Sequence, residues 1–125
     1  MHNKKVKQKL SFVIPSLGAG GAERVVSTLA NALINDYEVY IITFIKVVPF
    51  YKLHKDVQLM YCVDNVPPSR NIFNALKSNY ILLKKINAII KTEKIQLLIG
   101  FLTSANVLSV LAAKSNSIPS IISER

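Results

Sequence analysis

The sequence predicts an α/β fold built on a doubly wound parallel sheet of about five strands, in the order 3-2-1-4-5, with helices on both faces. Short apolar runs alternate along the chain with longer runs of helical periodicity, which indicates β-α-β units. The first apolar run, 10–14, is apolar on both sides, as expected of a central parallel strand. A glycine-rich turn then connects it to the first helical run, and right-handed crossovers favour the stated strand order.

The elements follow from the local pattern of each segment. Residues 1–9 are lysine-rich and are expected to form a flexible basic arm, and 10–125 to form one domain. The expected strands are 10–14, 37–44, 57–61, 95–101 and 120–123. The expected helices are 22–34, 71–92 and 104–114. The long helix has an apolar stripe of Ile72, Leu76, Leu83, Ile86 and Ile90.

Composition excludes several classes of protein. Of the 125 residues, 50% are hydrophobic and 18% are charged, which excludes a disordered chain. No apolar run approaches the roughly 18–20 residues of a membrane-spanning helix. Cys62 is the only cysteine, and we expect it to be a buried small residue rather than a nucleophile. No His, Cys, Asp or Glu cluster has the spacing of a metal site, so no metal is expected.

The formal net charge of +9 indicates a polyanionic partner. On charge alone, an anionic membrane, a phosphorylated substrate and nucleic acid are all open. The chain has no nucleic-acid-binding motif, so nucleic acid is not expected as a partner. Lys77, Lys84 and Lys91 repeat every seven residues on the long helix, with Lys85 beside them. They predict either a solvated helix face or a face that rests on an anionic membrane.

The glycine-rich turn is the first candidate binding site. A strand, a glycine turn and a helix together point backbone N–H groups and the positive end of the helix at an anion. Glycine accepts positive φ and lets a ligand approach the backbone, so Gly18, Gly20, Gly21 and Ala22 are candidate phosphate-binding residues. Glu23 stands where the dinucleotide-binding fingerprint has its third glycine, so that class is disfavoured. A tight turn without a ligand is the alternative.

A second group of candidates lies where the predicted topology places a crevice, at the carboxyl ends of strands 1 and 4. The candidates are Ser16, Thr103, Ser104, Asn106 and Glu124. The alternative is that Ser104 caps its helix, that Asn106 is an ordinary helix position and that Glu124 pairs with Arg125.

Four stretches of the chain resemble the N-terminal half of family-4 glycosyltransferases. They are GAGGAERVVSTLANAL, YEVYIITF, LLIGFLTSANVLSVLAAK and IPSIISER. These retaining enzymes have the GT-B fold of two Rossmann-like domains and use nucleotide-sugar donors. The resemblance implies that the glycine turn lies near the donor diphosphate, and that Ser16, Thr103, Ser104, Asn106 and Glu124 line the acceptor side of the cleft.

The resemblance also implies a function. It is transfer of a sugar from a nucleotide-sugar to a glycan or lipid-linked acceptor, in cell-surface polysaccharide or glycoconjugate synthesis. No cofactor is expected beyond the donor, which is a substrate, and the expected location is cytoplasmic, at the inner face of the membrane.

The chain departs from the family because nothing in it matches the second, donor-binding domain with its two glutamates spaced eight apart. We therefore expect a truncated N-terminal domain whose missing partner is that C-terminal domain, and which does not transfer sugar alone. The first alternative is a free-standing α/β module that binds a phosphate-bearing ligand without catalysis. The second is a basic accessory domain that associates with a membrane or with nucleic acid.

Overall fold

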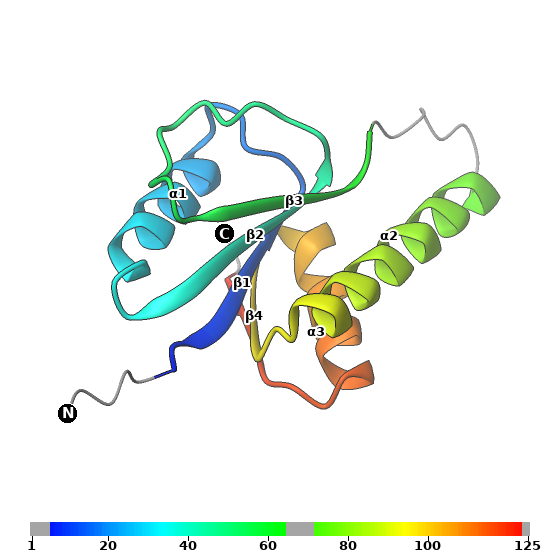
Figure 1. The fold of residues 1–125 in the computed structure, drawn as a ribbon. Helices are drawn as coiled ribbons and strands as arrows, with labels where there is room; N and C mark the ends of the chain where they lie inside the picture. The colour runs from blue at the N-terminus through cyan, green and yellow to red at the C-terminus, as the bar shows by residue number, and fades with distance from the viewer. Residues whose placement is uncertain (1–5, 65–71, 124–125) are drawn as a thin grey trace.

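A computed structural model describes residues 6–64 and 72–123 (Figure 1). The strands are β1 (Gln8–Ile14), β2 (Tyr37–Ile45), β3 (Gln58–Val63), β4 (Leu97–Phe101) and β5 (Ser120–Ser123). The helices are α1 (Gly21–Leu33), α2 (Ile72–Glu93) and α3 (Thr103–Ser115). All strand pairs are parallel and the strand order is β3-β2-β1-β4-β5, so the predicted fold class and topology are confirmed.

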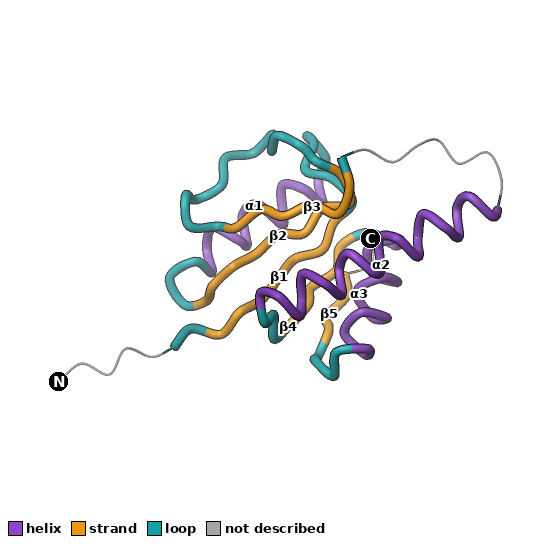
Figure 2. The backbone as a smooth tube through the Cα atoms, turned by 45° about the vertical axis from the view of Figure 1, so that its right-hand side comes forward, coloured by secondary structure: helices purple, strands orange, loops and turns teal. Residues whose placement is uncertain are grey.

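The sheet separates two hydrophobic cores. Helix α1 covers one face, and α2 and α3 cover the other (Figure 2). Phe12 and Ile14 of β1 point to the α1 side, whereas Val13 between them joins the core under α2 and α3. This alternation buries the central strand on both faces, which explains why its sequence is apolar without a period of two.

The chain leaves the sheet in opposite directions from two neighbouring strands. Strand β1 pairs with β2 on one side and with β4 on the other. The loop after β1 leads to α1 on one face, and the loop after β4 leads to α3 on the opposite face. The carboxyl ends of β1 and β4 are therefore the topological switch point, where open α/β sheets bind ligands.

Strand β1 begins at Gln8, two residues before the start expected from the apolar run. The Nζ of Lys9 donates a hydrogen bond to the carbonyl of Glu93 at 3.0 Å and lies 4.0 Å from the carboxylate of Glu38. Gln8 and Lys9 thus belong to the sheet rather than to the basic arm that the sequence predicts. Residues 1–5 lie outside the described residues.

Strand β4 begins at Leu97, two residues later than expected. The N–H of Ile95 bonds to the carbonyl of Ile90 at 3.0 Å, and Lys94 has a φ of 59°. These are the features of a left-handed turn that closes a helix C-terminus. Residues 95 and 96, which the apolar pattern alone assigns to the strand, therefore belong to the turn that ends α2.

The predicted apolar stripe of α2 is wrong at Leu76, and the side chain of Ile72 lies outside the described residues. Leu76 is 61% exposed, and the buried residues are Leu82, Ile86 and Ile90. The N-terminal half of α2 extends past the sheet, so no strand lies beneath it (Figure 1). The helix therefore buries only its C-terminal half against the sheet and leaves apolar side chains uncovered before that.

Candidate functional site

The glycine turn lies at the switch point, between β1 and α1. Gly18, Gly20 and Gly21 are all exposed, and Ser16 is half-buried. Gly20 is the N-cap of α1 with extended backbone angles, and no side chain caps the helix. The first-turn N–H groups, which have no partner within a helix, therefore lie at the open carboxyl edge of the sheet. This geometry suits the anion site that the sequence predicts.

The turn does not need glycine for its backbone conformation. No glycine in the described part of the chain has a positive φ, so the expectation of a left-handed glycine here is wrong. A Cβ atom added at Gly21 would have no neighbour within 4 Å, and one at Gly18 would only touch the carboxylate of Glu23 at 3.9 Å. The space above both residues is therefore open, and close approach of a ligand is the remaining physical reason for glycine at these positions.

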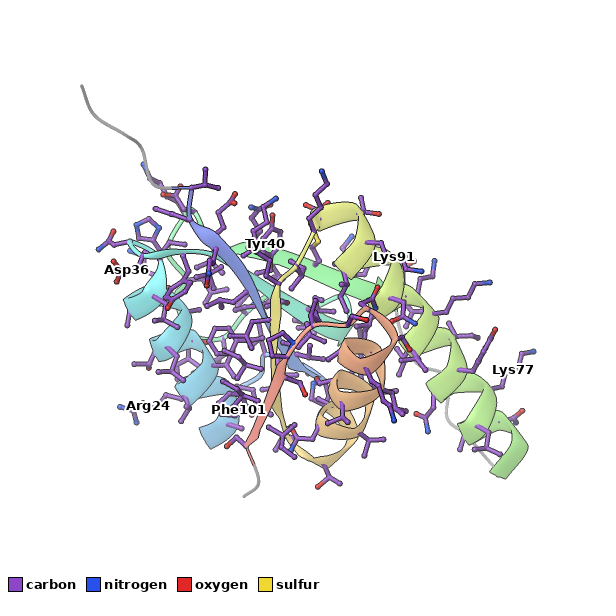
Figure 3. The ribbon with its side chains drawn as sticks, turned by 90° about the horizontal axis from the view of Figure 1, so that it is seen from below. Arg24, Asp36, Tyr40, Lys77, Lys91 and Phe101 are labelled. Atoms are coloured by element: carbon purple, nitrogen blue, oxygen red, sulfur yellow. The ribbon has the colours of Figure 1, made fainter. Side chains whose placement is uncertain are left out.

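Glu23 folds back over the start of its own helix. A Cβ at Gly20 would come within 2.6 Å of one carboxylate oxygen of Glu23 and 2.8 Å of the other. A carboxylate there stabilises the positive end of α1. A phosphate that approached Gly20 would have to displace this flexible side chain. Arg24 is exposed and points away from the sheet (Figure 3).

The connection between β2 and β3, residues 46–57, packs against the glycine turn, which the sequence analysis missed. The N–H of Phe50 donates to the carbonyl of Leu17 at 2.9 Å, and the hydroxyl of Tyr51 donates to the carbonyl of Ala19 at 2.8 Å. The rings of Phe50 and Tyr51 meet edge to face, with centroids 5.0 Å apart, and Phe50 is 67% exposed. The sequence feature that could have indicated this contact is the pair of adjacent aromatic residues, Phe50 and Tyr51, in a segment without regular periodicity.

Asn31 of α1 holds the same connection from the other side. Its Nδ2 donates to the carbonyl of Lys52 at 2.9 Å, and its Oδ1 accepts from the N–H of His54 at 2.7 Å. The glycine turn and the 46–57 connection are therefore tied to one another and to α1, which fixes the rim of the candidate anion site.

At the other side of the switch point, α3 begins without a side-chain cap. Its N-cap is Leu102, with φ 76° and ψ 148°, and Ser104 is the second residue inside the helix, so the predicted Ser104 cap is wrong. These angles are favourable essentially only for glycine, and a non-glycine residue there stores strain of order 1–3 kcal/mol. Thr103 and Ser104 are exposed at this edge.

Asn106 is buried and links α3 to β5 through a side-chain hydrogen bond. It is 5% exposed, and its Nδ2 donates to the carbonyl of Ser123 at 2.9 Å. Its Oδ1 and the hydroxyl of Ser109 both lie near Gly100, where an added Cβ would approach them to 2.7 and 2.9 Å. Asn106 therefore holds the end of β5 against α3, whereas Glu124, just beyond, lies outside the described residues.

Thr103 and Ser104 face a groove between α2 and α3, which we call the α2–α3 groove. Its volume is about 780 Å³, and apolar residues of both helices line it. It opens at the same edge of the sheet as the glycine turn, but on the face opposite α1. The candidates from the two loops thus share one edge, while Thr103 and Ser104 belong to this second depression.

The four candidate lysines are all exposed on α2 but do not share one side. At 100° per residue, Lys77, Lys84 and Lys91 follow one line along the helix, and Lys85 lies about 100° further round. Figure 3 shows Lys77 and Lys91 directed away from the sheet. Lys85 instead lines a depression next to β3, together with Cys62.

Cys62 is buried, as predicted. Burial raises the pKa of its thiol from 9.0 to about 11, and the nearby Lys85 ammonium partly opposes this rise. The thiol is therefore protonated at neutral pH and unsuited to nucleophilic attack. Within residues 6–64 and 72–123 there is no group of three His, Cys, Asp or Glu residues that could hold a metal, and no helix long and apolar enough to cross a membrane.

The fold defines a Rossmann-like α/β domain. It superposes on the C-terminal domain of the PF1911 hydrogenase of Pyrococcus furiosus with a TM-score of 0.68 and 15% identity, over 98% of this chain and 96% of that one. It also superposes on a UGT transferase of Siraitia grosvenorii in complex with UDP, with a TM-score of 0.63 and 16% identity, over 93% of this chain and 27% of that one. These likenesses identify the fold alone.

Sequence similarity identifies a particular relative. The chain is 35% identical over 118 residues to the GalNAc-α-(1→4)-GalNAc-α-(1→3)-diNAcBac-PP-undecaprenol α-1,4-N-acetyl-D-galactosaminyltransferase of Campylobacter jejuni. The match covers 93% of this chain and 32% of that enzyme, so the chain spans about a third of the relative's length. No family model matches the chain. The resemblance to glycosyltransferases is confirmed by this homology.

Proposed function

We propose that the chain forms the acceptor-side, N-terminal domain of a retaining glycosyltransferase that moves a sugar from a nucleotide-sugar to a glycan or lipid-linked acceptor. One observation carries the proposal. The chain is 35% identical over 118 residues to an enzyme whose name describes transfer of N-acetylgalactosamine to an undecaprenol-diphosphate-linked glycan. The domain needs no cofactor for this reaction. Its partners are the donor, the acceptor and a second, donor-binding domain.

The geometry of the switch point supports this assignment. The uncapped start of α1 and the open space above Gly18 and Gly21 suit the diphosphate of the donor. Ser16, Thr103 and Ser104 reach the same edge of the sheet and suit the acceptor. Asn106 supports them indirectly, because it positions the end of β5.

A lipid-linked acceptor would bring the domain to the cytoplasmic face of a membrane. Between residues 74 and 92, every charged residue of α2 is a lysine. Each lysine near an anionic lipid surface contributes about 1 kcal/mol to binding. Lys77, Lys84 and Lys91 therefore form the proposed membrane face, whereas Lys85 is turned toward β3.

The decisive experiment is a chimera in which this chain replaces the matching 118 residues of the Campylobacter enzyme. We expect the chimera to transfer N-acetylgalactosamine from its nucleotide-sugar donor to the acceptor of that enzyme, and we expect the 125-residue chain alone to show no turnover. The matched control is a chimera that carries the PF1911 domain instead, because it has the same fold with 15% identity. Activity of the control, or a folded but inactive chimera of this chain, would contradict the proposal.

A second variant tests the glycine turn. Gly21→Val places a side chain where no atom lies within 4 Å, so it should leave the fold intact while blocking approach of a phosphate. We expect kcat/KM of the active chimera for the nucleotide-sugar donor to fall by about tenfold or more, which corresponds to roughly 1.4 kcal/mol. If the isolated chain instead binds UDP tightly while every chimera is inactive, the non-catalytic binding module is the better description.

A further inference from the structure

The connection between β2 and β3 carries an exposed apolar pair beside the glycine turn. Exposure alternates along 46–54, where the even-numbered residues are exposed and the odd-numbered residues are half-buried. Val47 and Leu53 of the inward row pack against the core on the α1 side. Val48 and Phe50 belong to the outward row and are 93 and 67% exposed. The segment therefore presents two successive large apolar side chains of one row to solvent.

The backbone under this pair is fixed. The N–H of Phe50 donates to the carbonyl of Leu17, and the hydroxyl of Tyr51 donates to the carbonyl of Ala19. Figure 1 shows the connection running alongside the loop that leads from β1 into α1. Asn31 holds the connection from α1. An aromatic ring on a fixed backbone loses little conformational entropy when a ligand stacks on it, which suits Phe50 to binding.

The neighbours of the pair indicate the chemistry of its ligand. Lys46 and Lys52 flank Val48 and Phe50 in the outward row. The Nζ of Lys46 lies 5.7 Å from the centre of the Tyr61 ring, and neither lysine forms an ion pair in the described part of the chain. An aromatic ring in a cationic row complements a ligand that has both an apolar face and a negative charge. A sugar phosphate has both, because the C–H groups on one face of a pyranose ring pack on the negatively polarised face of an aromatic ring.

The covalent structure of the substrates favours a sugar ring over a nucleobase at this place. In a glycosyl diphosphate the sugar ring is joined to phosphorus through one oxygen, whereas a ribose separates a nucleobase from its nearest phosphate. The group that lies directly beside a diphosphate at the glycine turn is therefore the sugar.

We propose that Phe50 is a specificity-determining residue whose ring stacks on the pyranose ring of a glycosyl diphosphate. The inference rests on the proposed function, which has the diphosphate at the glycine turn, and deepens it by assigning a contact to the sugar. The nucleotide-sugar and a lipid-linked acceptor both contain a sugar joined to a diphosphate, so either substrate supplies this chemistry.

The test is a titration of the 125-residue chain with N-acetylgalactosamine 1-phosphate, followed by amide chemical shifts. We expect saturable shifts at 18–21 and at 46–54. Phe50→Ala should weaken binding about threefold to tenfold, as expected for the loss of one aromatic contact, and Phe50→Trp should restore it. Tyr80→Ala is the matched control and should bind like the wild type, because Tyr80 is 66% exposed but lies on α2.

Phe50→Leu separates stacking from general apolar contact. It keeps an apolar side chain without a flat ring, so it should also weaken binding, and it decides the test if Phe50→Ala loosens the connection. Wild-type affinity in Phe50→Leu, or no saturable shift within 46–54, would overturn the proposal. Equal binding of inorganic phosphate would overturn it as well, since the sugar would then contribute nothing. Tighter binding of UMP at 46–54 would identify a nucleobase as the occupant and would also overturn it.

Kinetics of the active chimera identify the substrate that supplies the sugar. A rise in KM for the nucleotide-sugar alone in Phe50→Ala assigns the stacked ring to the donor, and a rise in KM for the acceptor alone assigns it to the acceptor. Unchanged KM values for both substrates would overturn the proposal. An inactive chimera contradicts the proposed function but does not alter the titration of the isolated chain, so the two failures are distinguishable.

Discussion

At the scale of single residues, Gly100 is the glycine that the fold requires. A Cβ atom there would lie 2.7 Å from Oδ1 and 3.2 Å from Cα of Asn106, which its bond to Ser123 holds in place. We expect Gly100→Ala to lower the free energy of unfolding by roughly 1–3 kcal/mol through overpacking. Gly21→Ala is the control, and it should leave stability unchanged or raise it by up to about 1 kcal/mol. Equal urea midpoints for the two variants would contradict this reading.

Because its pKa is raised, Cys62 is expected to make the free energy of unfolding depend on pH in the alkaline range. Its thiol has a pKa of about 11 in the folded chain, against 9.0 for an unperturbed thiol. Below pH 9 the thiol is protonated in both the folded and the unfolded chain, so ionisation of Cys62 does not lower the free energy of unfolding there. Between pH 9 and 11 the unfolded chain releases the proton first, and the free energy of unfolding falls by at most roughly 2–3 kcal/mol. Urea unfolding at pH 8 and 10.5 checks this, and Cys62→Ala should show a smaller fall.

At the scale of elements, the 46–57 connection depends on Asn31 for its position over the glycine turn. Asn31→Ala removes the bonds to Lys52 and His54, each contributing about 0.5–1.5 kcal/mol. We expect faster amide exchange and proteolysis across 46–57, with the core strands still protected. Thr28→Ala is a matched control on the exposed side of α1, since the hydroxyl of Thr28 only bonds within its own helix. Unchanged exchange in Asn31→Ala would mean that the connection is held by other contacts.

The elements themselves were largely predictable, and their tertiary attachments were not. Strand order followed from alternating periodicity and the rules for crossovers, which act over short stretches of sequence. The bonds of Tyr51 to Ala19 and of Asn31 to Lys52 join residues 32 and 21 positions apart, and no local pattern marks them. The exposure of Leu76 was missed for a related reason. Periodicity tells which residues share a side of a helix, but not where the sheet beneath it ends.

The candidate site was predictable to the level of the sheet edge. The sequence placed the glycine turn and the start of α3 at one switch point, as the structure has them. It could not distinguish Asn106, which is buried, from its exposed neighbour Thr103, because both are polar residues at a helix start. The α2–α3 groove was not predicted because the apolar residues that line it have the helical spacing of residues that face a core.

At the scale of the whole molecule, the net charge of +9 should act mainly through one line of α2. We expect the triple variant Lys77, Lys84 and Lys91→Gln to bind anionic vesicles roughly 100-fold more weakly, at about 1 kcal/mol per lysine. The control triple Lys52, Lys55 and Lys114→Gln makes the same change in charge at exposed positions off α2.

Co-sedimentation with anionic vesicles at low and high salt measures the loss of binding in each triple variant and the dependence of binding on salt. Binding of the wild type should weaken as salt rises, because screening acts on exposed charges. Equal losses in the two triple variants would show that net charge alone attracts the membrane, and the line of lysines on α2 would then have no special role. A loss confined to the α2 triple would orient the domain with α2 against the membrane.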